Sequence, residues 1–459
     1  MQDDKLALIY EGNRINKVAI KTPAGLTERM DICKIVTQGG VTGPICCAVH
    51  TDGIGKQSLQ EDKHLYTYKG RVKIPALAMI DDIAQVSVCS TPSVKDNAYI
   101  NAKFEQGKQQ LNENKCHKIH TGKPSKFCPI LKAHEKSITN VKSERYVGDI
   151  ISDNGKHLTN ITARRGKGIG VVNEILSILN HMGLGPLYIQ AGLMLRTPML
   201  HAVLLSNAEA WLRLTSNEIK MLERVDEMLL RKLLKTPIST PRAALYLETG
   251  AIPLHLVIKS KRIMFLHHIL TRKRDALIAQ VLWAQIESPS EGDWYLVVME
   301  DIEALGLSET LTIDSISQLH KEKLKNIVRK GVHSAAFQEM MVRKESLSKI
   351  TPLEYDSLQI QSYLTVNNVP TRLKQLQFKW RTRMVKVGWN FGAKEKCPLC
   401  QKADDDQNHL LVCEKLDTIR TEHYESDTEP SFFREVEKRI RKREILLTHE
   451  KTQNTIQTI

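Results

Sequence analysis

The sequence has 459 residues, of which 41% are hydrophobic and 26% charged, so it is long enough to bury a sizeable core and to form two or more domains. Its 66 Lys and Arg against 52 Asp and Glu give a net charge of +14, which favours a polyanionic partner, nucleic acid before an anionic membrane surface. A basic soluble protein with neither partner is the alternative on charge alone. The most apolar window, residues 191–212, contains Arg196, Pro198 and Glu209, which excludes a membrane span and favours a buried helix.

The nine cysteines and the first residues indicate where the protein works. Six cysteines are scattered and three cluster near the end, and an odd number without a framework spacing favours a reducing compartment. The acidic start has no apolar run behind basic residues, so it is not a secretory signal. We expect an intracellular protein, cytoplasmic or in a nuclear ribonucleoprotein, with no membrane partner.

Taken in chain order, the predicted elements change character near residue 157. Short β-prone runs at 6–12 and 17–23, an apolar stretch at 74–88 and a helical pattern at 93–112 indicate a mixed first part. From there to about residue 350 the apolar residues recur with helical period, and the polar segment 288–293 is the best internal linker. The sequence therefore predicts an α+β fold, with a small antiparallel sheet first and a mostly helical remainder.

An acidic pair, Asp81 and Asp82, stands between two apolar runs of the 74–88 stretch. Two strands meeting at such a turn place carboxylates at the edge of a core, where they repel each other unless a cation binds, and hard oxygen ligands suit Mg²⁺. An ordinary charged hairpin turn is the alternative. Upstream, Gln38, Gly39 and Gly40 precede an apolar run, and clustered glycines allow close approach of a ligand to the backbone.

Near the end of the chain, four metal-binding residue types recur at knuckle spacing. The pattern Cys397-x2-Cys400-x8-His409-x3-Cys413 supplies three thiolates and one imidazole, a closed tetrahedral set for structural Zn²⁺. A zinc staple that only holds a small domain together is the alternative, and it is compatible with nucleic-acid binding.

Basic residues cluster in three places. Residues 372–396 interleave eight cations, among them Lys379, Arg381 and Arg383, with aromatic residues that include Trp380, a mixture that suits single-stranded nucleic acid. An amphipathic helix with its aromatics in the core explains the same segment equally well. A second group of candidate phosphate contacts is Arg164, Arg165 and Lys167. The third lies in the tail and is better explained as a solvated helix face or a localisation signal: Arg434, Lys438, Arg439, Arg441, Lys442 and Arg443.

Together, the motifs and their order from about Leu6 to Val412 resemble the reverse transcriptase of non-LTR retrotransposons, also called LINE-type elements. The Gln-Gly-Gly loop resembles the family's loop against the template and the incoming nucleotide, and residues 79–82 resemble its two-aspartate motif. Residues 114–116, with Lys115, resemble the motif whose lysine approaches the departing pyrophosphate. Tyr146, Val147 and Gly148 resemble the hairpin that grips the primer, and residues 161–170 resemble the entrance to the thumb. The cysteine cluster resembles the zinc knuckle near the end of these proteins.

The resemblance implies a set of domains. These are a partial palm (1–155), a helical thumb (156–240), a helical extension (241–369), a basic segment with the zinc knuckle (370–420) and a charged tail (421–459). It also implies an RNA-directed DNA polymerase that works on an RNA template and target DNA, with structural zinc and with Mg²⁺ at the polymerase site. Asp81, Asp82 and Lys115 would be its catalytic residues.

The sequence departs from the family pattern in two ways. Gly43 stands where the family more often has Ser, and Met79-Ile80 replaces an aromatic-Ala pair. The first catalytic carboxylate of the family lies well before the Gln-Gly motif, and the 37 residues before Gln38 contain no apolar strand ending in an aspartate. Because two metal ions need three carboxylates, we expect a truncated polymerase with little or no activity of its own. The alternatives are a non-catalytic nucleic-acid-binding retroelement remnant and a helical scaffold with a structural zinc site.

Overall fold

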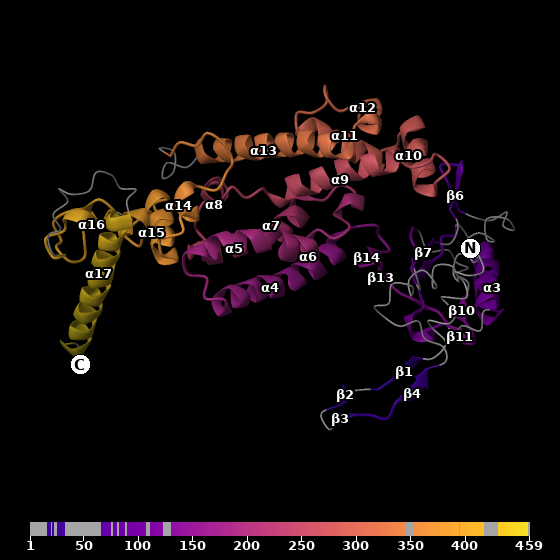
Figure 1. The fold of residues 1–459 in the computed structure, drawn as a ribbon, viewed down its shortest axis with the longest axis horizontal. Helices are drawn as coiled ribbons and strands as arrows, with labels where there is room; N and C mark the ends of the chain where they lie inside the picture. Colours follow the sequence, from indigo (N-terminus) through magenta and orange to yellow (C-terminus); the bar gives the residue numbers. More distant parts are fainter. Residues whose placement is uncertain are drawn as a thin grey trace. The chain divides into compact units, whose positions relative to one another are not determined.

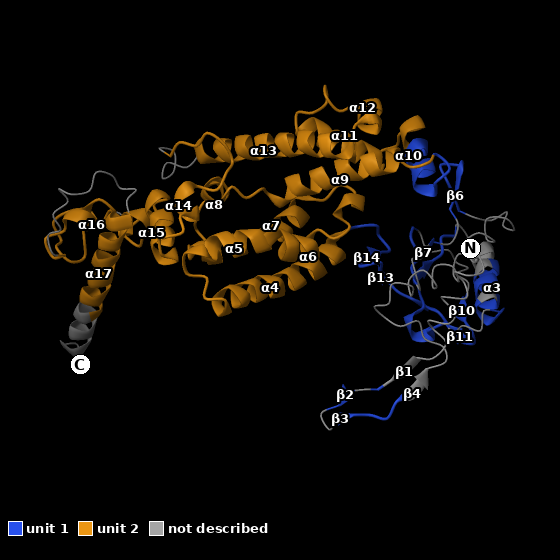
Figure 2. Ribbon diagram, viewed as in Figure 1, with its two compact units in different colours: residues 1–156, 274–284 blue, residues 157–273, 285–459 orange. Residues whose placement is uncertain are grey.

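The computed structural model forms two compact units (Figures 1 and 2). Unit 1 comprises residues 1–156 and 274–284, and unit 2 comprises residues 157–273 and 285–459. The structure describes residues 16–19, 21–22, 25–32, 66–74, 77–79, 82–87, 90–106, 111–122, 130–345, 353–393, 395–416 and 430–457. Gln38, Gly39, Gly40 and Asp81 lie outside these ranges.

Short strands dominate the described part of unit 1. They form seven two-stranded sheets, six antiparallel and one parallel, the parallel one joining β9 to β12. The strands are β1 (Asn16–Val18), β2 (Lys21–Thr22), β3 (Gly25–Leu26), β4 (Met30–Ile32), β5 (Tyr66–Tyr68), β6 (Val72–Ile74), β7 (Leu77–Met79), β8 (Asp82–Ala84), β9 (His117–Lys118), β10 (Lys132–Ala133), β11 (Lys136–Ser137), β12 (Thr139–Asn140), β13 (Ser143–Tyr146) and β14 (Asp149–Ser152).

One long helix, α3 (Ser90–Gln106), packs against β10 in this unit. Asn97 Oδ1 accepts the backbone N–H of Lys132 at 2.9 Å, and Asn101 Nδ2 donates to the Lys132 carbonyl at 2.8 Å. The helix confirms the helical pattern at 93–112, although it begins at Ser90 and ends at Gln106. A short 3₁₀ turn, η1 (Glu113–Lys115), follows and leads into β9.

Unit 2 is helical. Its first part contains α4 (Leu158–His181), η2 (Gly185–Leu187), α5 (Tyr188–Leu195), the π-helix η3 (Arg196–His201), α6 (Ala202–Leu204), η4 (Ala208–Ala210), α7 (Ser216–Leu234), α8 (Arg242–Thr249), α9 (Leu254–Leu270), α10 (Leu277–Glu287, whose first eight residues count with unit 1), α11 (Trp294–Ala304), α12 (Ile313–Gln318) and α13 (Lys321–Glu345). The segment predicted as a linker, 288–293, is the loop between α10 and α11.

Helices α4 and α7 form the centre of this part. Thr215 and Glu218 close a capping box at the start of α7, a helix in which four acidic residues are buried. The apolar residues of α7 recur at helical spacing and form one face of the helix. Its buried residues join Ile161, Val172 and others of α4 in one apolar core. A Cβ at Gly168 of α4 would lie 2.6 Å from Leu204 Cδ2, so the small residue lets α4 approach α6 closely.

The last part of unit 2 has a second apolar core. The elements of this last part are α14 (Ser362–Thr365), α15 (Thr371–Arg381), η5 (Gly388–Phe391), α16 (His409–Val412) and α17 (Pro430–Gln457). The core combines Trp380 of α15, the residues around the cysteine cluster, and Phe432, Phe433 and Val436 of α17.

Helix α17 corrects the interpretation of the tail as a solvated face. Arg439 and Arg443 are buried, at 4% and 8% exposure. Arg443 is paired with Asp405 beside the cysteine cluster at 2.7 Å, and Arg439 donates to the carbonyl of Leu410 at 3.1 Å. The prediction of a solvated face is therefore wrong for Arg439 and Arg443. A run of cations in the sequence does not show which of its members bind a neighbouring element. The exposed cations of this helix include Arg434, Lys438 and Arg441.

The described residues give an α+β fold, small sheets followed by helices, as the sequence predicted. The first segment of unit 1 ends at Lys156, one residue after the predicted end of the palm. The predicted thumb, extension and knuckle regions belong to unit 2, except for residues 274–284 of the extension, which belong to unit 1. Among the described residues, no helix is long and apolar enough to cross a membrane.

Candidate functional site

Asp82, the second residue of the acidic pair, begins the second strand of a hairpin. Strands β7 and β8 are antiparallel, with Met79 opposite Asp82, which confirms two short strands meeting at the acidic residues. Asp82 is the first residue of β8 and is exposed. Its neighbour Asp81, the other predicted metal ligand, falls outside the described residues.

A second hairpin, β13–β14, contains the predicted primer-grip residues. Tyr146 faces Asp149, and the turn between them places Val147 and Gly148 at φ of 46° and 88°. Two left-handed residues in a two-residue loop match the twist of the strands, so the glycine has a steric reason to be there. The predicted hairpin is confirmed.

The two hairpins touch each other. The Tyr146 hydroxyl donates to the Leu77 carbonyl of β7 at 3.3 Å, 69 residues away in sequence. Partial burial raises the pKa of the Tyr146 phenol, and the nearby Asp82 carboxylate raises it further. The structure therefore brings Tyr146 beside the hairpin that contains Asp82.

The third predicted motif joins the same group through β9. Lys115 is exposed at the end of η1, which Asn112 caps by accepting the N–H of Asn114 at 3.2 Å. Two residues on, His117 Nδ1 lies 2.6 Å from a Glu144 carboxylate oxygen on β13. Three segments that are distant in sequence are thus linked, from β9 to β13 and from β13 to β7.

The cysteine cluster is the best-formed site of the described residues. The ligand atoms of Cys397, Cys400, His409 and Cys413 all lie within 4.8 Å of one another. Cys397 Sγ lies 3.9 Å from Cys413 Sγ, and Cys400 Sγ lies 3.2 Å from His409 Nε2. A tetrahedral Zn²⁺ with Zn–S bonds of about 2.3 Å requires ligand separations of this size.

The local backbone builds that arrangement. The N–H of Gln401 donates to the Cys397 carbonyl at 2.8 Å, and Gln401 has a φ of 56°, so the Cys-x2-Cys segment turns back on itself. Helix α16 then presents His409 and Cys413 one turn apart. The backbone N–H of Lys402 lowers the pKa of the Cys400 thiol to about 6, while burial raises that of Cys413 to about 11. The donor set fits a metal ion such as zinc.

In the group of predicted phosphate contacts on α4, Arg164 already binds other parts of the fold. It is 5% exposed, donates to the Val203 carbonyl at 2.9 Å and stacks over the Trp211 ring at 5.1 Å. Arg165 and Lys167, by contrast, are exposed on α4. Because an α-helix turns by about 100° per residue, neighbouring cations point to different sides, and only Arg165 and Lys167 face solvent.

The basic and aromatic segment at 372–396 splits in the same way. Phe378 and Trp380 are buried, as the amphipathic-helix alternative predicts, and Trp380 meets Phe432 edge-to-face at 5.4 Å. Trp389 and Phe391 on η5 are 41% and 48% exposed. The predicted stacking role of Trp380 is therefore corrected by its burial, since a base cannot reach its face.

Two further cations of that segment serve the fold. Arg381 Nε lies 3.1 Å from the fully buried Glu248, which also accepts the Tyr355 and Tyr363 hydroxyls at 2.6 and 2.7 Å. Lys374, also fully buried, donates to the carbonyls of Pro186 and Leu364. The prediction that Arg381 contacts phosphate is therefore wrong, because the charge of Arg381 neutralises the buried Glu248 carboxylate. Lys379 and Arg383 are partly buried.

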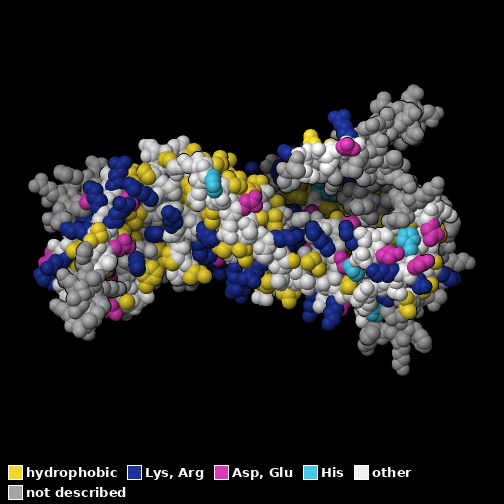
Figure 3. All heavy atoms as spheres, turned by 90° about the horizontal axis from the view of Figure 1, so that it is seen from below, with side chains coloured by type: hydrophobic (Ala, Val, Ile, Leu, Met, Phe, Trp, Pro, Cys, Tyr) yellow, Lys and Arg dark blue, Asp and Glu magenta, His cyan; other side chains and the backbone are white. Residues whose placement is uncertain are grey.

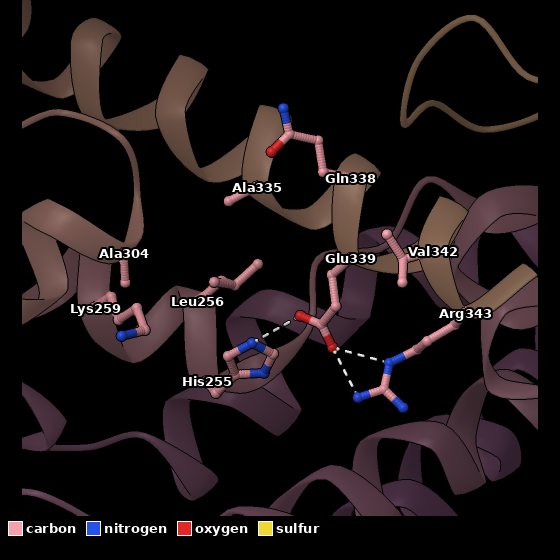
Figure 4. Close-up of a pocket in the computed structure, with 9 residues that line it drawn as sticks. All are labelled: His255, Leu256, Lys259, Ala304, Ala335, Gln338, Glu339, Val342 and Arg343. Atoms are coloured by element: carbon pink, nitrogen blue, oxygen red, sulfur yellow. Dashed lines mark hydrogen bonds and ion pairs between the residues drawn. The ribbon is translucent and has the colours of Figure 1, made fainter.

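Sequence reasoning missed a cavity of about 570 Å³ between α9 and α13 (Figure 4). His255 lies in its wall, with Nδ1 2.7 Å from Glu223 and Nε2 3.0 Å from Glu339. Burial lowers the pKa of His255, but its two carboxylate partners outweigh that effect and hold it above its ordinary value. Glu339 also pairs with Arg343, and Lys259 with Asp301, so these charges are matched within the fold.

A buried polar network was missed as well. Asp226, fully buried on α7, pairs with Arg196 through two contacts of 2.7 and 2.6 Å and with His201 at 3.1 Å. Both partners belong to the π-helix η3, whose widened turn brings their side chains to the same carboxylate. The positions of Arg196, His201 and Asp226 in the sequence form no motif that predicts this contact. These contacts hold α7 against η3.

No family model matches the chain, and no curated protein matches it. Among the described residues, the cysteine cluster is the one group of three or more metal-ligating side chains, so no carboxylate cluster accompanies Asp82 there. The candidate site for chemistry on nucleic acid therefore rests on the contacts within unit 1, and the metal site on the four ligands of unit 2.

Proposed function

We propose that the chain is a reverse-transcriptase polypeptide of the non-LTR retrotransposon type that binds RNA template and primed DNA. The observation that carries the proposal is the linkage in unit 1. The lysine motif connects to the Tyr146 hairpin through His117 and Glu144, and the Tyr146 hairpin connects to the Asp82 hairpin through Leu77. A polymerase needs these three parts around one primer end.

The chemistry of the parts agrees with that role. Asp82, with Asp81, would hold Mg²⁺, which would supply positive charge for the transfer of a nucleotide. Lys115 is exposed and could contact a phosphate. Arg165 and Lys167 give unit 2 solvent-facing cations for the nucleic-acid backbone. The zinc cluster would hold the last segment in shape.

Binding of a primed template with and without Mg²⁺ tests the proposal. We expect Mg²⁺ to strengthen binding of an oligo-dT primer on a poly-rA template several-fold, because an ion held by the two aspartates would offset the repulsion between their carboxylates and the phosphates. An Asp81→Asn/Asp82→Asn double variant should lose this gain. The matched control is Asp3→Asn/Asp4→Asn, which removes the same charge from another acidic pair and should keep the gain. Equal affinity with and without Mg²⁺ in all three proteins would overturn the proposal.

Primer extension under the same conditions tests the reaction itself. In-line transfer uses two metal ions about 4 Å apart and a third carboxylate to hold them. Because no such carboxylate joins Asp82 among the described residues, we expect these 459 residues to bind the primed template and to add no nucleotides. Product that depends on Asp81 and Asp82 would contradict that expectation, although it would strengthen the assignment to the polymerase class.

A further inference from the structure

A groove of about 670 Å³ runs between α15 and α17 in unit 2. Its floor is partly apolar and includes Leu376, Met384 and Ile440, and the exposed ring of Phe391 stands in its wall. Five cations and two carboxylates line it: Lys235, Arg372, Lys379, Lys386, Arg441, Glu437 and Glu444. Figure 3 shows Lys and Arg side chains gathered at the left, where these C-terminal helices lie.

The charges in the groove are only partly matched. Glu437 is shared by Arg372 at 3.4 Å and Arg441 at 2.9 Å. By contrast, Lys235, Lys379 and Lys386 make no ion pair among the described residues. Burial lowers the pKa of Lys379, and the neighbouring Lys235 lowers it further, whereas Glu444 raises it, so two ammonium groups share this space with one carboxylate. Like charges held together in a groove create a site for an anion.

The apolar floor of the groove and the exposed ring of Phe391 limit the class of ligand that fits. A phosphate alone would use the lysines but not Phe391 or the apolar floor. A nucleotide strand supplies both, since its phosphates meet the cations and an unpaired base can stack on an exposed aromatic ring. A base within a duplex presents no free face, which favours a single strand.

We propose that the groove between α15 and α17 binds single-stranded nucleic acid, with phosphates on Lys235, Lys379 and Lys386 and a base against Phe391. The inference rests on the proposed nucleic-acid function and locates a second binding site, separate from the hairpins of unit 1. It assigns single-strand binding to a part of unit 2 that carries none of the polymerase motifs.

The test measures the affinity of a labelled oligo-rU strand for the full chain over a range of salt concentrations. For single strands, each phosphate that a cation neutralises adds about 0.7 to the slope of log K against log salt, so Lys235→Ala/Lys379→Ala/Lys386→Ala should reduce the slope by about 2. Phe391→Ala should weaken binding about tenfold at every salt concentration and leave the slope unchanged. The matched control Lys438→Ala removes an exposed cation of α17 outside the groove and should change neither.

The outcomes separate the groove from the proposed function. Unchanged oligo-rU binding in the triple variant would overturn the proposal that the groove binds nucleic acid. The Mg²⁺-dependent binding of the primed template would still test the proposed function of unit 1 separately. Loss of oligo-rU binding with the Mg²⁺ effect intact supports both. An acidic peptide that binds the groove more tightly than oligo-rU, with the same loss in the variants, would overturn the proposal in favour of a protein partner. A thermal melt of each variant confirms that it is folded.

Discussion

Gly250 shows how a single residue can fix the join between two parts of unit 2. It ends α8 with a φ of 64°, and a Cβ there would lie 2.4 Å from the backbone nitrogen of Ile360 and 2.5 Å from the carbonyl carbon of Gln359. Next to it, Thr249 pairs with Ile360, and Gln361 N–H donates to the Glu248 carbonyl at 3.0 Å. The strand-like segment at 359–361 therefore lies against α8 only because this residue has no side chain.

We expect Gly250→Ala to destabilise the chain by about 3 kcal/mol or more, because it adds a backbone clash to the strain of a left-handed conformation. Gly306→Ala is the matched control: Gly306 has a φ of 67° and nothing within 4 Å of a Cβ. It should cost about 1 kcal/mol, the strain alone. Chemical denaturation measures both values. Equal losses in the two variants would show that the segment at 359–361 moves aside freely.

At the scale of elements, His255 joins α9 to α7 and α13. Because its pKa is raised, its contribution to stability is fully present below the unfolded value of about 6.5 and is lost as the pH rises through the folded value. Glu223 and Glu339 have lowered pKa values, so their contribution is lost as the pH falls below about 4. The three groups stabilise the fold together at mildly acidic pH.

The melting temperature of the native chain should therefore exceed that of His255→Gln most at about pH 5 to 6, and the gap should narrow toward about pH 9. Thermal melts of both proteins over this range give the comparison. In a Glu223→Gln/Glu339→Gln background only burial acts on the pKa of His255, so the gap should no longer widen toward acidic pH and should narrow there instead. A gap that grows toward alkaline pH would mean that His255 acts in its neutral form.

A metal ion held by the cysteine cluster would be coupled to α17 through the second core. Arg443 pairs with Asp405, which lies between the ligands Cys400 and His409 in sequence, and Phe433 is buried with Cys397 and Cys413. Without the metal the thiolates would repel each other and the ligands would separate, which removes the surface on which α17 rests.

Chelation should accordingly raise amide hydrogen exchange across α17 while the amides of α7 stay protected. Exchange measured by mass spectrometry before and after chelation tests this. Cys413→Ser should reproduce the effect of the chelator, and Cys116→Ser, at a cysteine outside the cluster, should not. Protection of α17 that survives chelation would show that the helix needs no metal.

The sequence predicted the parts of this fold whose signal is local. Ligand spacing identified the cysteine cluster, and the 3.6-residue period identified the helical region. The β13–β14 hairpin was expected from the resemblance of Tyr146, Val147 and Gly148 to a family motif. Which cations are free could not be predicted, because that depends on contacts such as Arg381 with Glu248, 133 residues apart. The groove between α15 and α17 and the cavity at His255 were missed for the same reason.

At the scale of the whole molecule, the two units have different parts in the proposed function. Unit 1 gathers the motif segments that would surround a primer end, and unit 2 supplies exposed cations, the groove and the metal site. The contacts of unit 1 and the groove of unit 2 are separate observations, so each can be tested by its own experiment. The proposed function depends above all on unit 1, whose hairpins would receive the primer.

Photo-crosslinking from the primer end tests whether these hairpins receive it. A primer with 4-thiothymidine at its 3′ terminus, annealed to an RNA template, is irradiated with the full chain, and the modified peptides are identified by mass spectrometry. We expect adducts within residues 77–84 or 143–152, around Asp82 and Tyr146. Adducts confined to residues 157–459 would refute this placement and leave a nucleic-acid-binding protein whose first unit does not receive the primer.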